Sequence, residues 1–296
     1  MTEYCEDYFK DEVRDGFLVH SMMKKVWATE MDVLEIVIQL CERHNLQYYA
    51  DWGTLLGTVR HGGFIPWDDD IDIAMRREDY NQFLALAEEL PEPFWLRTNQ
   101  TDEAFDDSFA SVLNGKILST DEKHMQRFHG CPYILGIDIF PLDYIPRDKE
   151  AAQVQRTVCE LIITIISLMR RNLDPVMIDK RICEVETICS IKIDKTRNVK
   201  SQLYRLLDAV SQLYTEEESD ELTIFGLGPQ YSDYRLKKKW YADTIIMPFE
   251  KLSLQVPVGY DQVLKKMYGD YRKKIKFTAS HTYPCFKEQE KLLNKR

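Results

Sequence analysis

The apolar positions of this chain follow a helical period in some stretches and a strand period in others. From about residue 21 to residue 45 they recur at steps of three and four, which predicts one long amphipathic helix. Ser21 suits the N-cap of this helix and Asn45 its left-handed C-cap. Further helices are expected at residues 53–60 and 77–90, and strands at residues 46–50, 70–75, 94–98, 110–119 (with a hairpin turn at Asn114-Gly115) and 135–143. This order predicts an α+β fold, a mixed sheet core flanked by helices.

Residues 149–215 differ from the rest, because they contain no glycine and Pro175 is their single proline. Apolar residues at helical spacing predict about three helices there. Residues 216–296 return to mixed structure, with strands expected at residues 245–249 and 251–256 and a helix at residues 261–268. We therefore expect a catalytic core at residues 20–148, a helical insertion lobe at residues 149–215, and a C-terminal part at residues 216–296 that completes the catalytic domain.

The longest apolar run, residues 158–169, is shorter than the roughly 20 residues that cross a membrane. It is predicted to be a buried helix. The alternative is peripheral contact with a membrane, because Arg156, Arg170 and Arg171 flank the run.

Composition and charge limit the classes of function that this protein can have. Of the 296 residues, 44% are hydrophobic and 30% charged, which is typical of a soluble globular protein. The formal net charge of −10 argues against a nucleic-acid duplex held by general electrostatics, although a nucleotide can still bind at a local site. The seven scattered cysteines and the acidic N-terminus indicate reduced thiols and no signal peptide, so we expect a cytoplasmic protein, with the inner face of the membrane as an alternative location.

Four aspartates lie within five positions, at residues 68, 69, 70 and 72. In an extended strand the period of two places Asp68, Asp70 and Asp72 on one face, with Asp69 pointing away. Like charges this close are costly unless a cation neutralises them. A face with oxygen ligands only suits a hard divalent cation, Mg²⁺ or alternatively Mn²⁺. The working hypothesis is a metal-dependent phosphoryl-transfer site.

Asp138 is the second chemical feature, a single carboxylate between isoleucines in a predicted strand. A buried lone carboxylate is rare without a partner or a metal. We expect it to be the third metal ligand, with the capping of a turn at the strand end as the alternative.

These residues resemble the DNA polymerase beta-like nucleotidyltransferase fold, which combines a Gly-Thr turn on a short helix, an Asp-x-Asp strand and a third strand carboxylate. More narrowly, the sequence resembles the LicD family of phosphocholine transferases, which are related to the fukutin-type ribitol-phosphate transferases. The resemblance extends from about residue 46 to residue 281, and the helical lobe contributes little to it. It rests on residues 53–57, 67–72, 137–143, 248–250, 256–261 and 268–271 and on His281.

The resemblance implies site roles. Asp70, Asp72 and Asp138 would hold the metal ion against a diphosphate, and Asp68 would either bind metal or accept the proton of the acceptor hydroxyl. The N–H groups at Gly53 and Thr54, where a helix begins, would cradle phosphate oxygens. The other expected substrate contacts are Arg60, His61, Trp67 and His281, for which a helix-end charge (Arg60) and a plain surface histidine (His281) are the alternatives.

The resemblance also implies the reaction, in which phosphocholine moves from CDP-choline to a sugar hydroxyl of a teichoic acid or lipopolysaccharide type glycan, or of its lipid-linked precursor, and CMP is released. Transfer of ribitol or glycerol phosphate, nucleotidyl transfer from a nucleoside triphosphate and a non-enzymatic Ca²⁺-binding scaffold are the alternatives. The cation of choline is best held by aromatic faces. Candidates are Trp52, Trp67, Tyr133, Tyr231, Tyr234, Trp240, Tyr241, Tyr268, Tyr271 and Tyr283.

Overall fold

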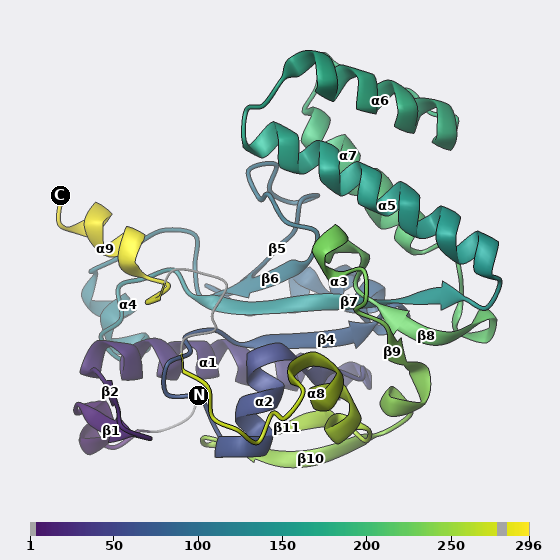
Figure 1. Ribbon diagram of the computed structural model, residues 1–296. Coiled ribbons are helices and arrows are strands. Elements are labelled where there is room, and N and C mark those ends of the chain that lie inside the picture. The colour runs from purple at the N-terminus through teal and green to yellow at the C-terminus, as the bar shows by residue number, and fades with distance from the viewer. Residues whose placement is uncertain (1–3, 277–282, 296) are drawn as a thin grey trace. The chain divides into compact units, whose positions relative to one another are not determined.

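The computed structural model describes residues 4–276 and 283–295 (Figure 1). It confirms the predicted α+β class, because a mixed sheet is flanked by helices and a helical lobe is inserted in the chain. The chain forms two compact units. The first unit comprises Met1–Leu96, Ser111–Phe140 and Ala242–Arg296, and the second comprises Arg97–Ala110 and Pro141–Tyr241. The domain boundaries expected at residues 20–148, 149–215 and 216–296 stay a prediction.

The long helix α1 (Ser21–His44) carries the predicted apolar stripe, in which Val26 is fully buried. The helix ends at Asn45 in the left-handed conformation, with φ 54°, as its sequence position predicts. Its beginning differs from the prediction, since Ser21 is the first helical residue and not the N-cap. The Asp11 carboxylate accepts the Ser21 N–H at 2.6 Å and so satisfies one of the helix-start donors from outside the helix.

The two strands that border the aspartate cluster lie side by side in the sheet. β3 and β4 are antiparallel, with Ala50 opposite Ile73, so the residue after β3 lies next to the residue that begins β4. The strand order is β3 (Tyr49–Ala50), β4 (Asp72–Arg76), β7 (Gly136–Pro146), β6 (Ala110–Leu113) and β5 (Trp95–Arg97).

Several predicted strands are shorter in the structure, and β3 covers only residues 49–50 of the expected 46–50. β4 begins at Asp72, so residues 68–71 form a loop and not the start of a strand. β6 ends at Leu113, and the predicted hairpin turn at Asn114-Gly115 is wrong. The physical reason is that the Asn114 side chain donates to the Tyr133 carbonyl at 3.1 Å and accepts the Leu135 N–H at 2.9 Å. The amide thus ties this segment to the chain that leads into β7.

Further elements of the first unit surround this sheet, and helix α2 packs against β4, β10 and α8. The predicted helix at residues 77–90 is divided, because α3 ends at Ala85 and a 3₁₀ turn follows at Ala87–Glu89. The bounds are β1 (Glu12–Arg14), β2 (Phe17–Val19), α2 (Trp52–His61), α3 (Arg77–Ala85), α4 (Glu122–Arg127), β10 (Thr244–Phe249), β11 (Leu252–Pro257), α8 (Tyr260–Tyr268) and α9 (Lys287–Leu293).

The second unit contains the predicted helices α5 (Lys149–Arg170), α6 (Pro175–Cys189) and α7 (Val199–Ser211), which share one apolar core. Among the described residues, α5 is a helix long and apolar enough to cross a membrane by length and composition. Val158, Cys159, Ile162, Ile165 and Ile166 are buried in the core of the lobe, and the other residues from 158 to 169 are partly exposed. The run is a helix, as predicted, and it is buried along one side.

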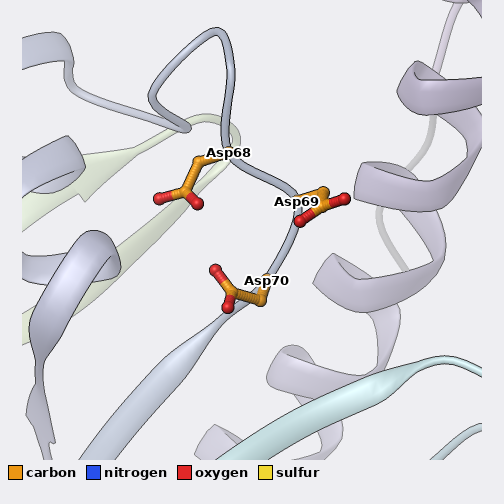
Figure 2. A group of neighbouring side chains, drawn as sticks. All are labelled: Asp68, Asp69 and Asp70. Atoms are coloured by element: carbon orange, nitrogen blue, oxygen red, sulfur yellow. The ribbon is translucent and has the colours of Figure 1, made fainter. Parts of the chain in front are cut away.

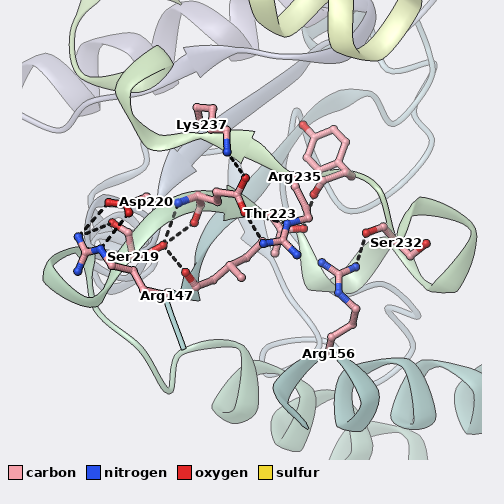
Figure 3. A network of polar contacts seen from close by, with 11 residues as sticks. Arg147, Arg156, Ser219, Asp220, Thr223, Ser232, Arg235 and Lys237 are labelled. Atoms are coloured by element: carbon pink, nitrogen blue, oxygen red, sulfur yellow. Dashed lines mark hydrogen bonds and ion pairs between the residues drawn. The ribbon is translucent and has the colours of Figure 1, made fainter. Parts of the chain in front are cut away.

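Strands β8 (Ser219–Thr223) and β9 (Leu236–Lys237) complete the second unit, where β8 pairs with the second half of β7. Figure 3 shows the polar contacts that hold them. Arg147 binds Asp220 at 3.0 Å, and Glu221 accepts hydrogen bonds from both Arg235 and Lys237, the latter at 2.6 Å. These contacts are ion pairs between neighbouring strands and the segments that adjoin them within the unit.

Candidate active site

The predicted aspartate cluster lies in the loop that leads into β4. Carboxylate oxygens of Asp68, Asp69 and Asp70 lie within 4.8 Å of one another. Figure 2 shows that the carboxylates of Asp68 and Asp70 turn to one side of the loop, whereas Asp69 points to the other side, towards a neighbouring helix. Asp69 is fully buried and accepts the Cys285 N–H at 2.5 Å. The separation of Asp69 from its neighbours follows the prediction, although a loop and not a strand produces it.

Two hydrogen bonds fix the shape of this loop. The Asp68 N–H donates to the Ile65 carbonyl at 2.9 Å, which closes a turn, and the Asp68 carbonyl accepts the indole N–H of Trp27 at 3.1 Å. Trp27 belongs to α1 and is fully buried. The backbone at Asp68 is therefore held against the protein core.

The carbonyl and N–H groups of Asp72 connect the start of β4 to the start of α2. The Asp72 carbonyl accepts the Asp51 N–H at 3.1 Å, and the Asp72 N–H donates to the Thr54 hydroxyl oxygen at 2.8 Å. Asp51 also caps the helix, since its carboxylate accepts the Trp52 N–H at 2.9 Å. The Thr54 hydroxyl keeps its own proton for a further acceptor.

Gly53 is the point where the α2 start and the aspartate loop meet. A Cβ atom placed on Gly53 would lie 2.4 Å from Oδ2 of Asp68, closer than atoms can approach. The Asp68 carboxylate thus lies directly against the first turn of the helix, where the helix dipole favours negative charge. Sequence analysis predicted that Gly53 and Asp68 belong to one site, and the structure brings them together.

Asp138 lies on β7, as predicted, and is held from both sides. Its Oδ1 accepts the Ser111 hydroxyl at 2.6 Å, and its N–H donates to the Ile71 carbonyl at 2.9 Å. Ser111 is on β6 and 1% exposed. Sequence reasoning missed Ser111, because a serine in a short strand carries no signal without the strand order.

Burial and negative charge act together on Asp72. Burial, followed by the charges of Asp70 and Asp138, raises the pKa of the Asp72 carboxyl well above its ordinary value. Carboxylates in such a field favour a proton or a bound cation. Oxygen donors suit Mg²⁺, and the carboxylates that lie within 4.8 Å of one another are those of Asp68, Asp69 and Asp70. The metal set predicted at Asp70, Asp72 and Asp138 stays a prediction.

Two further side chains, from other parts of the chain, are affected by the negative charge of these aspartates. Glu30 of α1 is 2% exposed, and burial together with the charge of Asp69 raises its pKa well above the ordinary value. Burial and the charges of Asp51 and Asp72 raise the pKa of the Tyr268 hydroxyl. Sequence analysis did not identify Glu30 as a site residue, because it lies among the apolar residues of α1 and no neighbouring motif marks it.

The other predicted substrate contacts have structural partners. Arg60 donates to the carbonyl of Tyr271 at 3.1 Å, and His61 lies 3.1 Å from the Asp15 carboxylate. The Trp67 ring is 5% exposed and lies edge-on to His61, with 6.5 Å between the centroids. His281 lies outside the described residues. Substrate contact by these four residues stays a prediction.

His61 gives a stability prediction. Burial, followed by the charge of Arg60, lowers the pKa of His61 from 6.5 to about 4. Between these values the unfolded state binds more protons than the folded state, so stability rises with pH from about 4 to 6.5. We expect His61→Gln to remove this slope, a difference on the order of 3 kcal/mol across the window. Urea unfolding of both proteins at several pH values checks it, and parallel slopes would contradict it.

Comparisons with known proteins point the same way as the site. Residues 45–151 match the family model described as LicD/FKTN/FKRP, nucleotidyltransferase domain. The chain is 28% identical to the lipopolysaccharide cholinephosphotransferase LicD of Haemophilus influenzae over 262 residues, 85% of this chain and 93% of the relative. A shorter match joins it to ribitol 5-phosphate transferase FKRP of Homo sapiens, 42% identical over 43 residues, 14% of this chain and 9% of the relative. Another is an uncharacterized protein of Rickettsia typhi, 49% identical over 45 residues, 15% of each chain.

The mixed-sheet core, the family match and the long alignment together define a transferase. The resemblance to the LicD family seen in the motifs is confirmed by the matched domain at residues 45–151 and by the long alignment with LicD.

Proposed function

We propose that this enzyme transfers phosphocholine from CDP-choline to a sugar hydroxyl and releases CMP. The acceptor is a cell-surface glycan of teichoic acid or lipopolysaccharide type, or its lipid-linked precursor. The observation that carries the proposal is the contact of Asp68 with Gly53 at the start of α2, within the field shared by Asp70, Asp72 and Asp138. A helix start beside clustered carboxylates suits a diphosphate bridged to a cation.

The proposed cofactor is Mg²⁺, with Mn²⁺ as an alternative, held by Asp70, Asp72 and Asp138. When bound, the cation neutralises the charge that develops on the leaving CMP and orients the diphosphate. Ser111 holds Asp138 in one orientation before any ligand arrives. This preorganisation spares the cost of ordering the carboxylate at the moment of binding.

The residues at the start of α2 have separate proposed roles in the transfer reaction. The N–H groups of Gly53 and Thr54 donate to phosphate oxygens, and the free Thr54 hydroxyl proton adds one donor. The acceptor oxygen forms a bond to the phosphorus atom that carries choline. The bond between that phosphorus and the bridging oxygen of the diphosphate breaks, and the electron pair of the broken bond leaves with CMP. Asp68 accepts the proton of the acceptor hydroxyl, because its carboxylate lies at the phosphate cradle.

Recognition of choline is proposed for Tyr268, an aromatic side chain at the end of α8. Tyr268 is 38% exposed and lies in the field of the active-site carboxylates, so its ring is both accessible and close to the reaction. Burial argues against other candidates for a cation–π contact, since each of these is at most 7% exposed. They are Tyr133, Tyr234, Tyr241 and Tyr271.

Ser111 gives a direct prediction about the proposed metal site. Ser111→Ala should lower Mg²⁺ affinity by about 10- to 100-fold, because it removes the hydrogen bond that orients Asp138. Calorimetric titration with Mg²⁺ measures this, and Ser111→Thr, which keeps the hydroxyl, should recover part of the loss. Unchanged affinity in Ser111→Ala with intact folding would show that Asp138 does not bind the metal.

The donor is tested by thermal unfolding with CDP-choline, CDP-ribitol, CDP-glycerol or CTP in the presence of Mg²⁺. A ligand at 100 times its Kd stabilises the folded state by about 2.7 kcal/mol, so the true donor should give the largest rise in Tm. We expect CDP-choline to give it. A larger rise with CDP-ribitol would favour ribitol phosphate transfer, which the similarity to FKRP makes the second candidate.

Nucleotidyl transfer from a nucleoside triphosphate is a further alternative, suggested by the name of the matched family domain. In that reaction pyrophosphate leaves instead of CMP, so product identity separates the two. We propose the cytoplasm as the compartment, because buried Cys41, Cys131 and Cys159 are free thiols.

A further inference from the structure

The turn after α5 and the first turn of α6 carry three exposed apolar side chains within five residues. Leu173 is 45% exposed, Val176 is 78% exposed and Met177 is 47% exposed. These three residues lie within residues 171–181, which also contain the basic residues Arg171, Lys180 and Arg181. We name residues 171–181 the lobe tip. Large apolar side chains that gather on a surface mark an interaction site more often than scattered ones do.

The lobe's own core does not need these side chains. The buried residues of α6 are Ile182 and Val185, which begin one turn after Met177 and join the core shared with α5 and α7. The Asp174 carboxylate accepts the Val176 N–H at 3.0 Å and fixes the beginning of α6. The three apolar side chains are therefore held outward by a capped helix start and not left over from loose packing.

The lobe tip contains three basic residues, Arg171, Lys180 and Arg181, and two acidic ones, Asp174 and Asp179, so its charge is slightly positive; Asp179 pairs with Lys195 at 2.8 Å. Within the described part of the chain, the side chains of Arg171 and Lys180 make no ion pair or hydrogen bond. The neighbouring Arg181 is neutralised by Glu184, at 2.8 Å. Since the whole chain has a net charge of −10, two unpaired cations beside exposed apolar residues are a local exception to its general charge.

We propose that the lobe tip docks onto an anionic lipid surface, with Leu173, Val176 and Met177 entering the boundary between headgroups and acyl chains and Arg171 and Lys180 contacting lipid phosphates. Apolar side chains flanked by Lys and Arg are what such an interface binds. The apolar run inside α5 is a weaker candidate for the contact, because none of its residues from 158 to 169 is as exposed as Leu173, Val176 and Met177. The inference is independent of the donor proposed above.

Co-sedimentation of the full chain with vesicles tests the proposal. We expect binding to vesicles of phosphatidylcholine with about a third phosphatidylglycerol and weaker binding to phosphatidylcholine alone, because each basic residue near an anionic surface contributes about a fivefold gain. Val176→Asp with Met177→Asp should lower the partition coefficient by about tenfold or more. Lys180→Ala should lower it about fivefold on anionic vesicles only.

The matched control uses Val154→Asp and Leu213→Asp, two apolar residues of the same unit that are each 61% exposed. Val154 lies about 25 Å from the lobe tip along α5, at 1.5 Å per residue. The control should bind vesicles as the wild type does. Equal loss in the control, no binding to either vesicle, or dimerisation that Val176→Asp abolishes would each overturn the proposal. Donor turnover is not part of the assay, so its result leaves the catalytic proposal untouched.

Discussion

Asp70→Asn should lose at least about 10³-fold in turnover, equivalent to about 4 kcal/mol of transition-state stabilisation. The Asp70 oxygens lie within 4.8 Å of those of Asp68, and its charge contributes to the raised pKa of Asp72. Removing that charge relieves repulsion, so the variant without metal should be at least as stable as the wild type. Its Mg²⁺ affinity should fall together with its turnover.

Asp68→Asn tests the proposed role of Asp68 as the base against the alternative of a metal ligand. If Asp68 is the base, turnover falls strongly while Mg²⁺ affinity measured by calorimetry stays near that of the wild type. Asp220→Asn provides the control, since that carboxylate is on the surface of the second unit and pairs with Arg147. A parallel loss of metal affinity in Asp68→Asn would make Asp68 a ligand, and full activity of Asp70→Asn would contradict the metal site.

Gly53→Ala should lower turnover by about 100-fold, the second large effect. The new Cβ would meet Oδ2 of Asp68 at 2.4 Å, so the carboxylate must move away from the start of α2. A displacement of about 1 Å in a reacting group typically costs about 10²-fold in rate. The crowding should also destabilise the fold by about 1–3 kcal/mol, which urea unfolding measures.

Gly115→Ala is the matched control, because a Cβ at Gly115 meets nothing within 4 Å. It should change neither turnover nor stability by a measurable amount. The Gly53→Ala and Asp68→Ala double variant adds a further check, since removing the carboxylate also removes the clash. If Gly53→Ala destabilised the protein equally in both backgrounds, the clash with Asp68 would not be its cause.

The sequence predicted the parts of the site that lie in one continuous stretch. The Gly-Thr turn, the aspartate run and the strand with Asp138 each carry a local pattern, and the α+β class and the helical lobe followed from periodicity. The strand assigned to residues 70–75 was right in place but too long. Asp70 belongs to the preceding loop, where the turn at Ile65 and the indole of Trp27 determine the backbone.

What the sequence could not supply are contacts between distant segments. Ser111 reaches Asp138 only because β6 and β7 are neighbours in the sheet, and Glu30 enters the negative field only because α1 packs beside the loop of Asp69. The predicted cap at Ser21 failed for the same reason. Asp11, ten residues earlier, takes the helix-start N–H that a local cap would have bound.

The most direct test of the central claim is to identify the nucleotide product formed from CDP-choline in the presence of a glycan acceptor, with Mg²⁺ and after its removal by a chelator. Teichoic acid and lipopolysaccharide serve as the acceptors, and CTP is the comparison donor. We expect CMP from CDP-choline, formation that stops on chelation and resumes with added Mg²⁺, and an acceptor that gains phosphocholine. Pyrophosphate release from CTP without CMP from CDP-choline, or CMP formation that is unchanged by chelation, would contradict it.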